Sequence, residues 1–334
     1  MVGDCSSDED AANFAEEAGF DFTVADYEPP TEISAEVLRT QINQIVATFG
    51  SETCEVTATS AAAAAAADST DGNGTCGCLR KYDAAAATCD TLVVAFAALG
   101  GFGGGGAGGD FEFVGVCERA RVAHALFLKD VRRAWYLLGI ERVASDFDEV
   151  VAVIVQDAVR LQPSHVVMLG ASMGGYAAIR AGLALNGPGL SSIRILAFAP
   201  QICAEPAERA LLDLAPMAFD ADLRRCKERC DGLRRLPSAM DALLRNAPDA
   251  HAPGGRDPAA AVEIEVHVGD RQTGDVHEAL LLREAARGSS RVAVHVEVHR
   301  GLGHLLARDL RASGQLEGLL HRVLARDAGG FGCH

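Results

Sequence analysis

The pattern of apolar and polar residues becomes regular at about residue 91. From there, short apolar runs alternate with longer segments whose apolar residues recur at helical spacing. This alternation predicts an α/β domain whose mostly parallel, doubly wound sheet is covered by helices on both faces. The expected strands are residues 91–96, 123–128, 165–169, 193–198, 262–268 and 292–298, and the clearest expected helices are residues 149–161, 173–185 and 308–325.

One long segment interrupts this alternation. Residues 205–249 are rich in charge, have a helical pattern and contain no strand signal. Because they follow the fourth expected strand, we expect them to lie above the carboxyl edge of the sheet as a helical cap, within an insert of about residues 203–258. The surrounding α/β domain is expected to cover residues 89–328.

The first 88 residues lack this organisation. They begin with an acidic stretch, continue with a helix-like pattern at residues 38–46, and reach a run of alanines at residues 61–67 before the turn-forming residues 68–75. We therefore expect residues 1–88 to be an irregular N-terminal extension that carries no catalytic chemistry.

Composition and charge argue against some classes of binding partner. The chain has 334 residues, of which 49% are hydrophobic and 5% aromatic, and its formal net charge is -16. A charge of this sign opposes binding to nucleic acid or to an anionic membrane surface. No apolar run approaches the roughly 20 residues that span a bilayer, and the N-terminus is acidic where a targeting peptide would be basic. These features predict a soluble, cytoplasmic protein without a nucleic-acid partner, and they leave its oligomeric state open.

The ten cysteines are scattered along the chain. Cys76 and Cys78, and likewise Cys226 and Cys230, have a spacing that metal sites use, but neither pair is matched by a second ligand pair at zinc-site distance. We expect reduced thiols, no metal site and no cofactor.

The strongest candidate for chemistry is the turn between residues 165–169 and residues 173–185. It reads Gly170-Ala-Ser172-Met-Gly174, and a Gly-x-Ser-x-Gly pattern between a strand and a helix is typical of a nucleophile elbow. A phosphate-binding turn would need Gly-x-Gly-x-x-Gly and an acidic residue about 20 positions later, and neither is present. The pattern predicts Ser172 as a nucleophile, with Gly170 and Gly174 leaving room for the sharp turn.

A serine nucleophile requires a base and an acid. His304 lies in Gly-Leu-Gly-His between the last expected strand and the last expected helix, on a loop that can bring the imidazole over Ser172. Two aspartates follow residues 262–268. Asp275 precedes the next expected helix and is the preferred acid, whereas Asp270 at the strand end is the alternative.

The remaining histidines of this region have simpler interpretations. His295 and His299 share one face of an expected strand with Glu297, which is typical of the solvated face of an edge strand. His267 lies inside a strand and His321 inside a helix. We expect both to be structural.

A developing oxyanion needs two backbone donors. The N–H of Met173, at the start of a helix, is the expected first donor, and the N–H of Ala98 or of Leu99, after residues 91–96, is the expected second. The glycine-rich residues 100–109 that follow are expected to be a disordered insertion, with an active-site flap as the alternative.

An aspartate and two aromatic residues follow the second expected strand. They are Asp130 and the pair Trp135-Tyr136. We expect Asp130 to cap a helix while the aromatic side chains pack. The segment also resembles bacterial members of the α/β-hydrolase superfamily in which a strand ends in Asp and a Trp-Tyr pair follows, and this resemblance implies the alternative, that Asp130 orients the active-site edge.

Together, Gly-Ala-Ser172-Met-Gly-Gly, the acid after residue 268 and Gly-Leu-Gly-His304 make residues 90–325 resemble the α/β-hydrolase superfamily. The resemblance implies the α/β-hydrolase fold and acyl transfer: Ser172 attacks a carbonyl, His304 moves the proton, and the aspartate orients the imidazole. The chain departs from lipases and esterases of this superfamily in lacking a His-Gly pair near Ala98.

These observations predict a serine hydrolase that cleaves a carboxylic ester or thioester through a Ser-His-Asp triad and an acyl-enzyme. Its substrate would be a small-molecule or lipid-like acyl compound. An acyltransferase is a close alternative, because water access decides between the two outcomes. A non-catalytic scaffold or interaction protein of the same fold is the alternative from a different class.

Overall fold

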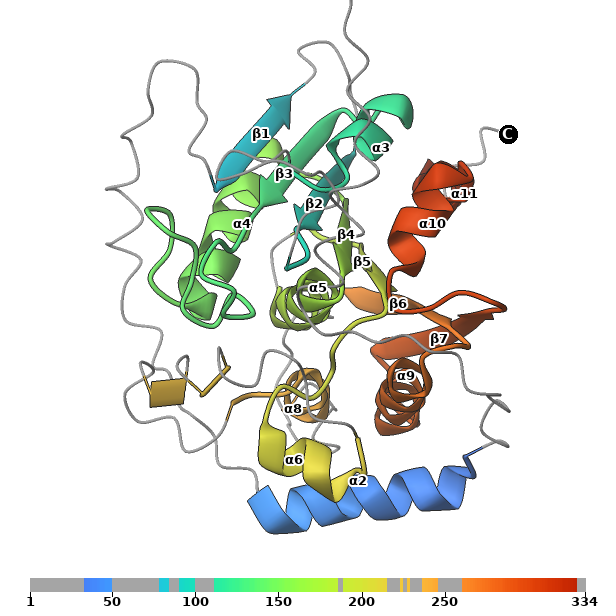
Figure 1. The fold of residues 1–334 in the computed structure, drawn as a ribbon. Coiled ribbons are helices and arrows are strands. Elements are labelled where there is room, and N and C mark those ends of the chain that lie inside the picture. The colour runs from blue at the N-terminus through green and yellow to red at the C-terminus, as the bar shows by residue number, and fades with distance from the viewer. Residues whose placement is uncertain are drawn as a thin grey trace, which may run out of the picture.

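A seven-stranded sheet forms the centre of the computed structural model (Figure 1). The structure describes residues 33–49, 78–83, 90–99, 111–185, 189–214, 223–224, 227–228, 236–245 and 260–328. The strands lie in the order β1-β3-β2-β4-β5-β6-β7. β1 pairs antiparallel with β3, and every other neighbouring pair is parallel. The strands are β1 (Leu79–Asp83), β2 (Thr91–Phe96), β3 (His124–Leu128), β4 (His165–Ala171), β5 (Ser192–Phe198), β6 (Ala261–Gly269) and β7 (Val292–His299).

The sheet confirms the mostly parallel architecture and contains all six expected strands. The central strand β4 continues two residues beyond its expected end, to Ala171, because the chain stays extended until it reaches Ser172. In the middle of the sheet the strands are buried on both faces, as the continuous apolar run of β2 predicts.

The strand β1 is an addition that the hydrophobic pattern did not reveal. Its sequence, Leu-Arg-Lys-Tyr-Asp, has no apolar run, and it pairs along the whole of β3 from Leu79 opposite Leu128 to Asp83 opposite His124. An edge strand has a neighbour on one side only and therefore accepts charged residues. The sheet thus begins before the domain boundary that we expected at residue 89.

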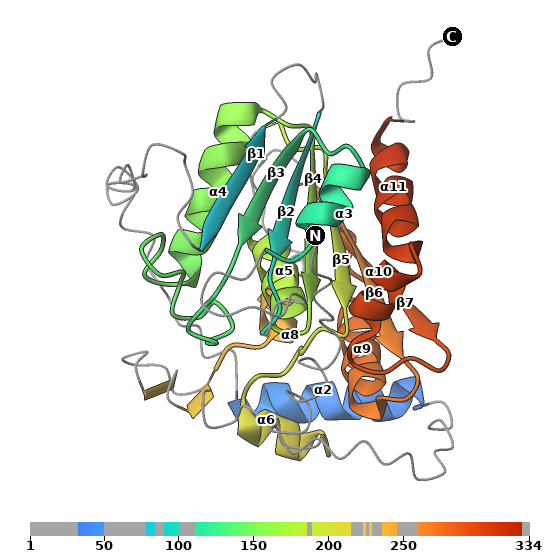
Figure 2. The same cartoon turned by 45° about the horizontal axis from the view of Figure 1, so that its top comes forward.

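Helices cover both faces of the sheet (Figure 2). One apolar cluster joins the sheet to α2, α4, α5, α8 and α9, and a second joins the opposite face to α3, α10 and α11. No helix in the described part of the chain is long and apolar enough to cross a bilayer. The helices are α2 (Ala35–Phe49), α3 (Val114–Arg119), α4 (Phe147–Leu161), α5 (Met173–Ala184), α6 (Pro206–Leu211), α8 (Ala239–Arg245), α9 (Thr273–Ala285), α10 (Leu306–Ala312) and α11 (Gln315–Ala328).

The helix α2 comes from the expected N-terminal extension, yet it packs against the α/β domain. Leu38, Ile42 and Ile45 are buried in the larger apolar cluster, one helical turn apart. Figure 1 shows α2 lying across α6 and α9. The helix-like pattern at residues 38–46 therefore marks a structural part of the domain.

The expected cap is described in part. α6 and α8 lie within residues 203–258, and Figure 2 shows both beyond the carboxyl ends of the strands. Residues 215–222 and 246–259 lie outside the described residues, as do Cys76, Cys226 and Cys230. The glycine-rich residues 100–109 are outside them too, so their expected disorder stays a prediction.

Candidate active site

Ser172 occupies the sharp turn between β4 and α5. Its backbone φ of 50° and ψ of -118° fall in a region that non-glycine residues rarely adopt. The N–H of Ser172 donates to the carbonyl of Phe198 at 2.9 Å, which ties the turn to the end of β5. The strained serine is therefore held at the helix N-terminus by the central strands.

Gly170 and Gly174 are required by this turn. A Cβ on Gly170 would lie 2.1 Å from the carbonyl oxygen of Gly174, and a Cβ on Gly174 would lie 2.3 Å from the carbonyl oxygen of Phe96. Both neighbours are backbone atoms, which cannot rotate away as a side chain can. The same close contact brings the end of β2 next to the start of α5.

The side chains of Ser172, His304 and Asp275 form a hydrogen-bonded series. His304 Nε2 lies 2.9 Å from Ser172 Oγ, and His304 Nδ1 lies 2.8 Å from Asp275 Oδ2. A carboxylate can only accept, so Nδ1 carries the proton and Nε2 is left to accept from the serine hydroxyl. Three separate elements supply the residues, because Asp275 is in the first turn of α9 and His304 is in the loop between β7 and α10.

The alternative acid, Asp270, contacts a different atom. Its Oδ1 accepts from the N–H of Gly301 at 2.7 Å, while the N–H of Asp270 donates to the carbonyl of His299 at 3.1 Å. The neighbouring N–H of Arg271 donates to Leu302 at 3.0 Å. Asp270 thus ties the end of β6 to the loop that carries the histidine, and the structure brings only Asp275 of the two to the imidazole.

The surroundings of His304 change its basicity. Burial disfavours the charged imidazolium, but the charge of Asp275, its hydrogen bond and the charge of Glu278 outweigh burial, so the pKa of His304 is raised above its ordinary value of 6.5. A base of raised pKa takes a proton from serine more readily, provided that the solution keeps it neutral.

Glu278, which the sequence did not reveal, anchors the segment after β5. Its Oε2 accepts from the N–H groups of Ile202 and Cys203 at 2.5 and 3.0 Å, and its Oε1 lies 2.6 Å from Arg209 Nη1. Burial raises the pKa of Glu278 even though Arg209 and these donors oppose the shift. The one sequence signal is its place three residues after Asp275, on the same side of α9.

The candidate oxyanion donors lie at the start of α5 and just after the end of β2. Met173 opens α5, where the first N–H groups of a helix have no partner within it. On the other side, the N–H of Ala98 donates to Glu112 Oε2 at 2.6 Å, and Leu99 is the last described residue before residue 111. Ala98 would have to leave Glu112 in order to bind an oxyanion.

Glu112 was also missed by sequence reasoning. Burial raises its pKa to about 8, against the opposing effects of the Ala98 N–H and the Arg311 charge. Its Oε1 has no hydrogen-bond partner among the described residues. The carboxyl that contacts the loop after β2 is therefore neutral at neutral pH.

Asp130 organises a turn rather than capping a helix, which corrects our expectation. Its carboxylate accepts from the N–H groups of Arg132, Ala134 and Tyr136 at 2.8 to 2.9 Å, within a non-helical segment. The segment needs these bonds because several of its residues, Tyr136 among them, have positive φ. The hydroxyl of Tyr136 lies 3.0 Å from the carbonyl of Ala97, so this turn supports the loop that carries Ala98.

The other histidines lie elsewhere. His321 is on α11, and His295 is exposed on β7. His267 is buried in β6 and stacks on Phe198 with ring centroids 5.2 Å apart. Burial, together with the neighbouring His299 and Arg322, lowers the pKa of His267 to about 3, so it is a neutral side chain.

Comparison with known proteins finds similarity in structure only. No protein-family model matches the chain. No curated protein matches it either. An esterase/lipase from an uncultured bacterium is 15% identical, with a TM-score of 0.49, over 94% of this chain and 96% of that one. A hormone-sensitive lipase from a metagenome library is 16% identical, with a TM-score of 0.47, over 71% of this chain and 77% of that one. MenH from S. aureus is 11% identical, with a TM-score of 0.46, over 75% of this chain and 99% of that one.

The strand order of this chain itself defines the class of fold. An edge strand antiparallel to the rest, a crossover that places β3 outside β2, and a strained serine after the central strand β4 are the features of an α/β-hydrolase fold. The first turn of α9, which follows β6, and the loop that follows β7 then supply an aspartate and a histidine to the same edge of the sheet. The expected fold class is thereby confirmed.

Proposed function

We propose that this protein is a serine hydrolase that cleaves a carboxylic ester or a thioester of a small-molecule or lipid-like acyl substrate. One observation carries the proposal: Ser172 Oγ, His304 and Asp275 are connected by contacts of 2.9 and 2.8 Å in the order that nucleophile, base and acid require. A serine hydroxyl is a weak nucleophile by itself, and this arrangement is the usual means of activating it.

The reaction follows from these contacts. His304 Nε2 takes the proton of Ser172 as Oγ attacks the carbonyl carbon, and the resulting imidazolium is stabilised by Asp275. The imidazolium then gives its proton to the departing alcohol or thiol, which leaves an acyl group on Ser172. Water attacks this acyl-enzyme with His304 again as base, releasing the acid and restoring the serine.

The negative charge on the substrate oxygen needs donors near Ser172. The N–H of Met173 is our first assignment, because it follows the nucleophile at the start of α5. The second is the N–H of Leu99 or of Ala98, on the loop that Tyr136 and Glu112 support. One donor of this kind is typically worth about 3 to 4 kcal/mol of barrier.

Labelling with a fluorophosphonate tests the proposal, because the probe reacts with an activated serine. We expect wild type to be labelled once, Ser172→Ala to be unlabelled and to lose ester turnover by about four orders of magnitude or more, and the exposed Ser191→Ala control to behave as wild type. Absence of labelling in correctly folded wild type would instead favour a non-catalytic scaffold.

A further inference from the structure

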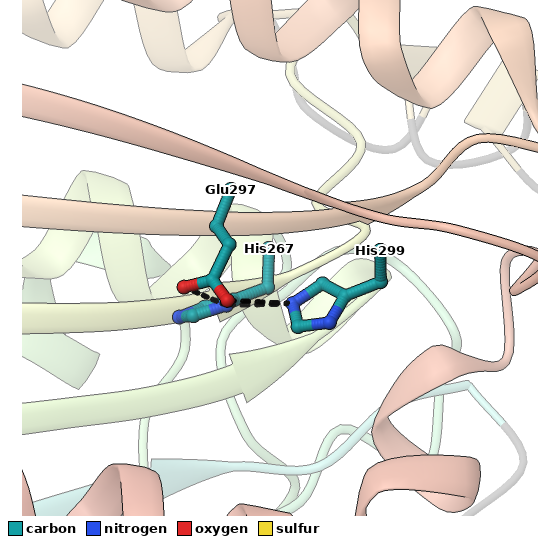
Figure 3. A group of neighbouring side chains, drawn as sticks. All are labelled: His267, Glu297 and His299. Carbon is teal, nitrogen blue, oxygen red and sulfur yellow. Dashed lines mark hydrogen bonds and ion pairs between the residues drawn. The ribbon is translucent and has the colours of Figure 1, made fainter.

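Two histidines and a glutamate converge on the face of β6 and β7 that is turned toward α11. His267 comes from β6, and Glu297 and His299 come from β7 (Figure 3). The register places Glu297 directly opposite His267 and places His299 opposite Gly269, the next position on the same face. Side chains in such positions are close neighbours across a pair of strands. The three side chains therefore meet as a consequence of strand pairing.

The spacing of their polar atoms suits a single small cation. His267 Nδ1 lies 3.0 Å from His299 Nε2 and 3.5 Å from Glu297 Oε2, and His299 Nε2 lies 3.8 Å from Glu297 Oε1. Ligands held about 2.1 Å from one ion in tetrahedral or octahedral geometry are about 3.0 to 3.4 Å apart. One atom from each residue fits this requirement after small movements, since all three lie within 4.8 Å of one another.

Burial of the three ligands is graded from the core to the surface. The side chain of His267 is 1% exposed, that of His299 is 14% exposed and that of Glu297 is 56% exposed. The ring of Phe198 stacks on the His267 ring and holds it in place. An ion could therefore enter from the solvent side, past Glu297, and reach a nitrogen that is already held in place.

A carboxylate is also available to orient the buried ligand. His267 Nε2 has no hydrogen-bond partner among the residues that the structure describes, and Glu265 Oε2 lies 3.9 Å from it. Arg326 in turn contacts Glu265 at 2.8 Å. When one nitrogen of a histidine binds a metal, the other usually donates to such a carboxylate, so Glu265 occupies the place of an outer partner.

We propose that His267, Glu297 and His299 bind one divalent transition-metal ion, with Zn²⁺ as the best match. Two imidazole nitrogens and one carboxylate favour Zn²⁺ and its neighbours in the transition series over Mg²⁺ and Ca²⁺, which prefer oxygen ligands alone. Solvent completes the coordination. The ion would hold together the carboxyl ends of β6 and β7, which precede the helix α9 that carries Asp275 and the loop that carries His304.

Titration of the full-length protein with Co²⁺, an optical substitute for Zn²⁺, tests this site. Nitrogen and oxygen ligands give weak visible bands without the intense charge-transfer absorption of a cysteine site. We expect one such site in wild type, and dissociation constants at least about tenfold higher in Glu297→Gln and in His299→Gln. His295→Gln is the matched control, because this side chain lies on the same face of β7, is 64% exposed and is outside the cluster.

Thermal unfolding gives a second measurement that does not depend on absorption. Zn²⁺ should raise the unfolding midpoint of wild type and of His295→Gln by several degrees, and EDTA should reverse the shift. At the same Zn²⁺ concentration, Glu297→Gln and His299→Gln should show a clearly smaller shift than wild type. Equal binding by all four proteins, cysteine-type absorption, or absence of binding by wild type would overturn the proposal and leave the three residues as a hydrogen-bonded group.

Discussion

Asp270 and Asp275 lie five residues apart after β6, yet their carboxylates contact different atoms. Asp275 Oδ2 is 2.8 Å from the imidazole of His304, and Asp270 Oδ1 is 2.7 Å from the backbone N–H of Gly301. The first contact can set the tautomer and stabilise a charge that appears during the reaction. The second can only hold the loop in position. At the residue scale, the two positions therefore have different expected kinetics.

We expect Asp275→Asn to lower kcat by about three to four orders of magnitude, because an amide can hold His304 in the wrong tautomer. Asp270→Asn keeps an oxygen that can accept from Gly301, so its kcat should stay within about tenfold of wild type. Hydrolysis of p-nitrophenyl esters of graded chain length measures both. A larger loss in Asp270→Asn than in Asp275→Asn would assign the acid to Asp270.

The raised pKa of His304 predicts the pH dependence of activity. The imidazole must be neutral to accept the serine proton, and it becomes protonated as the pH falls through its pKa. Because that pKa lies above 6.5, the acidic limb of kcat/KM in wild type should lie above pH 6.5. Asp275→Asn removes the charge that raises the pKa while burial continues to lower it, so the limb of its residual activity should move to lower pH. A limb that stays in place or moves upward would contradict this.

At the scale of elements, the close contact between β2, β4 and α5 depends on Gly174. In Gly174→Ala the new Cβ would meet the carbonyl oxygen of Phe96, so a strand and a helix must separate. We expect a loss of several kcal/mol in the free energy of unfolding, measured by urea denaturation.

Gly318 is the matched control for this substitution. It lies within α11, and a Cβ at this position has nothing within 4 Å. Gly318→Ala should therefore gain roughly 0.5 to 1 kcal/mol from the lower helix propensity of glycine. Equal effects at the two glycines would show that the turn has room for a side chain.

At the scale of the whole molecule, the N-terminal helix α2 packs against the α/β domain. Ile45 is 3% exposed and packs in the larger apolar cluster, whereas the adjacent Val46 is 44% exposed. We expect Ile45→Ala to lower the free energy of unfolding by about 2 to 5 kcal/mol and Val46→Ala to lower it by less than about 1 kcal/mol. Fluorescence of Trp135, the single tryptophan, reports the change, because this side chain is buried in the segment between β3 and α4.

This measurement also tests cooperativity. If α2 unfolds together with the sheet, the Trp135 transition of Ile45→Ala moves to lower urea as one step. An unchanged Trp135 transition, with an earlier loss of helical circular dichroism, would show that α2 unfolds independently.

Much of the fold could be predicted from the sequence, because the patterns that indicate a strand or a turn involve neighbouring residues. The apolar run at residues 91–96 is the strand β2, and the turn around Ser172 is recognisable from five consecutive residues, since backbone sterics act between near neighbours. The strand β1 was missed because an edge strand does not need an apolar run. Asp130 was assigned to a helix cap because the positive φ angles that end any helix there leave no mark in the sequence.

The sequence by itself determined the six strands from β2 to β7, the position of Ser172 and a short choice of its base and acid, because these depend on residues next to one another. Only the tertiary structure decided that Asp275 faces His304, that Glu112 meets Ala98, and that the side chains of β6 and β7 converge at His267. Each of these contacts joins residues that are distant along the chain. Their distances follow from strand register and loop path, which the packing of the whole core determines.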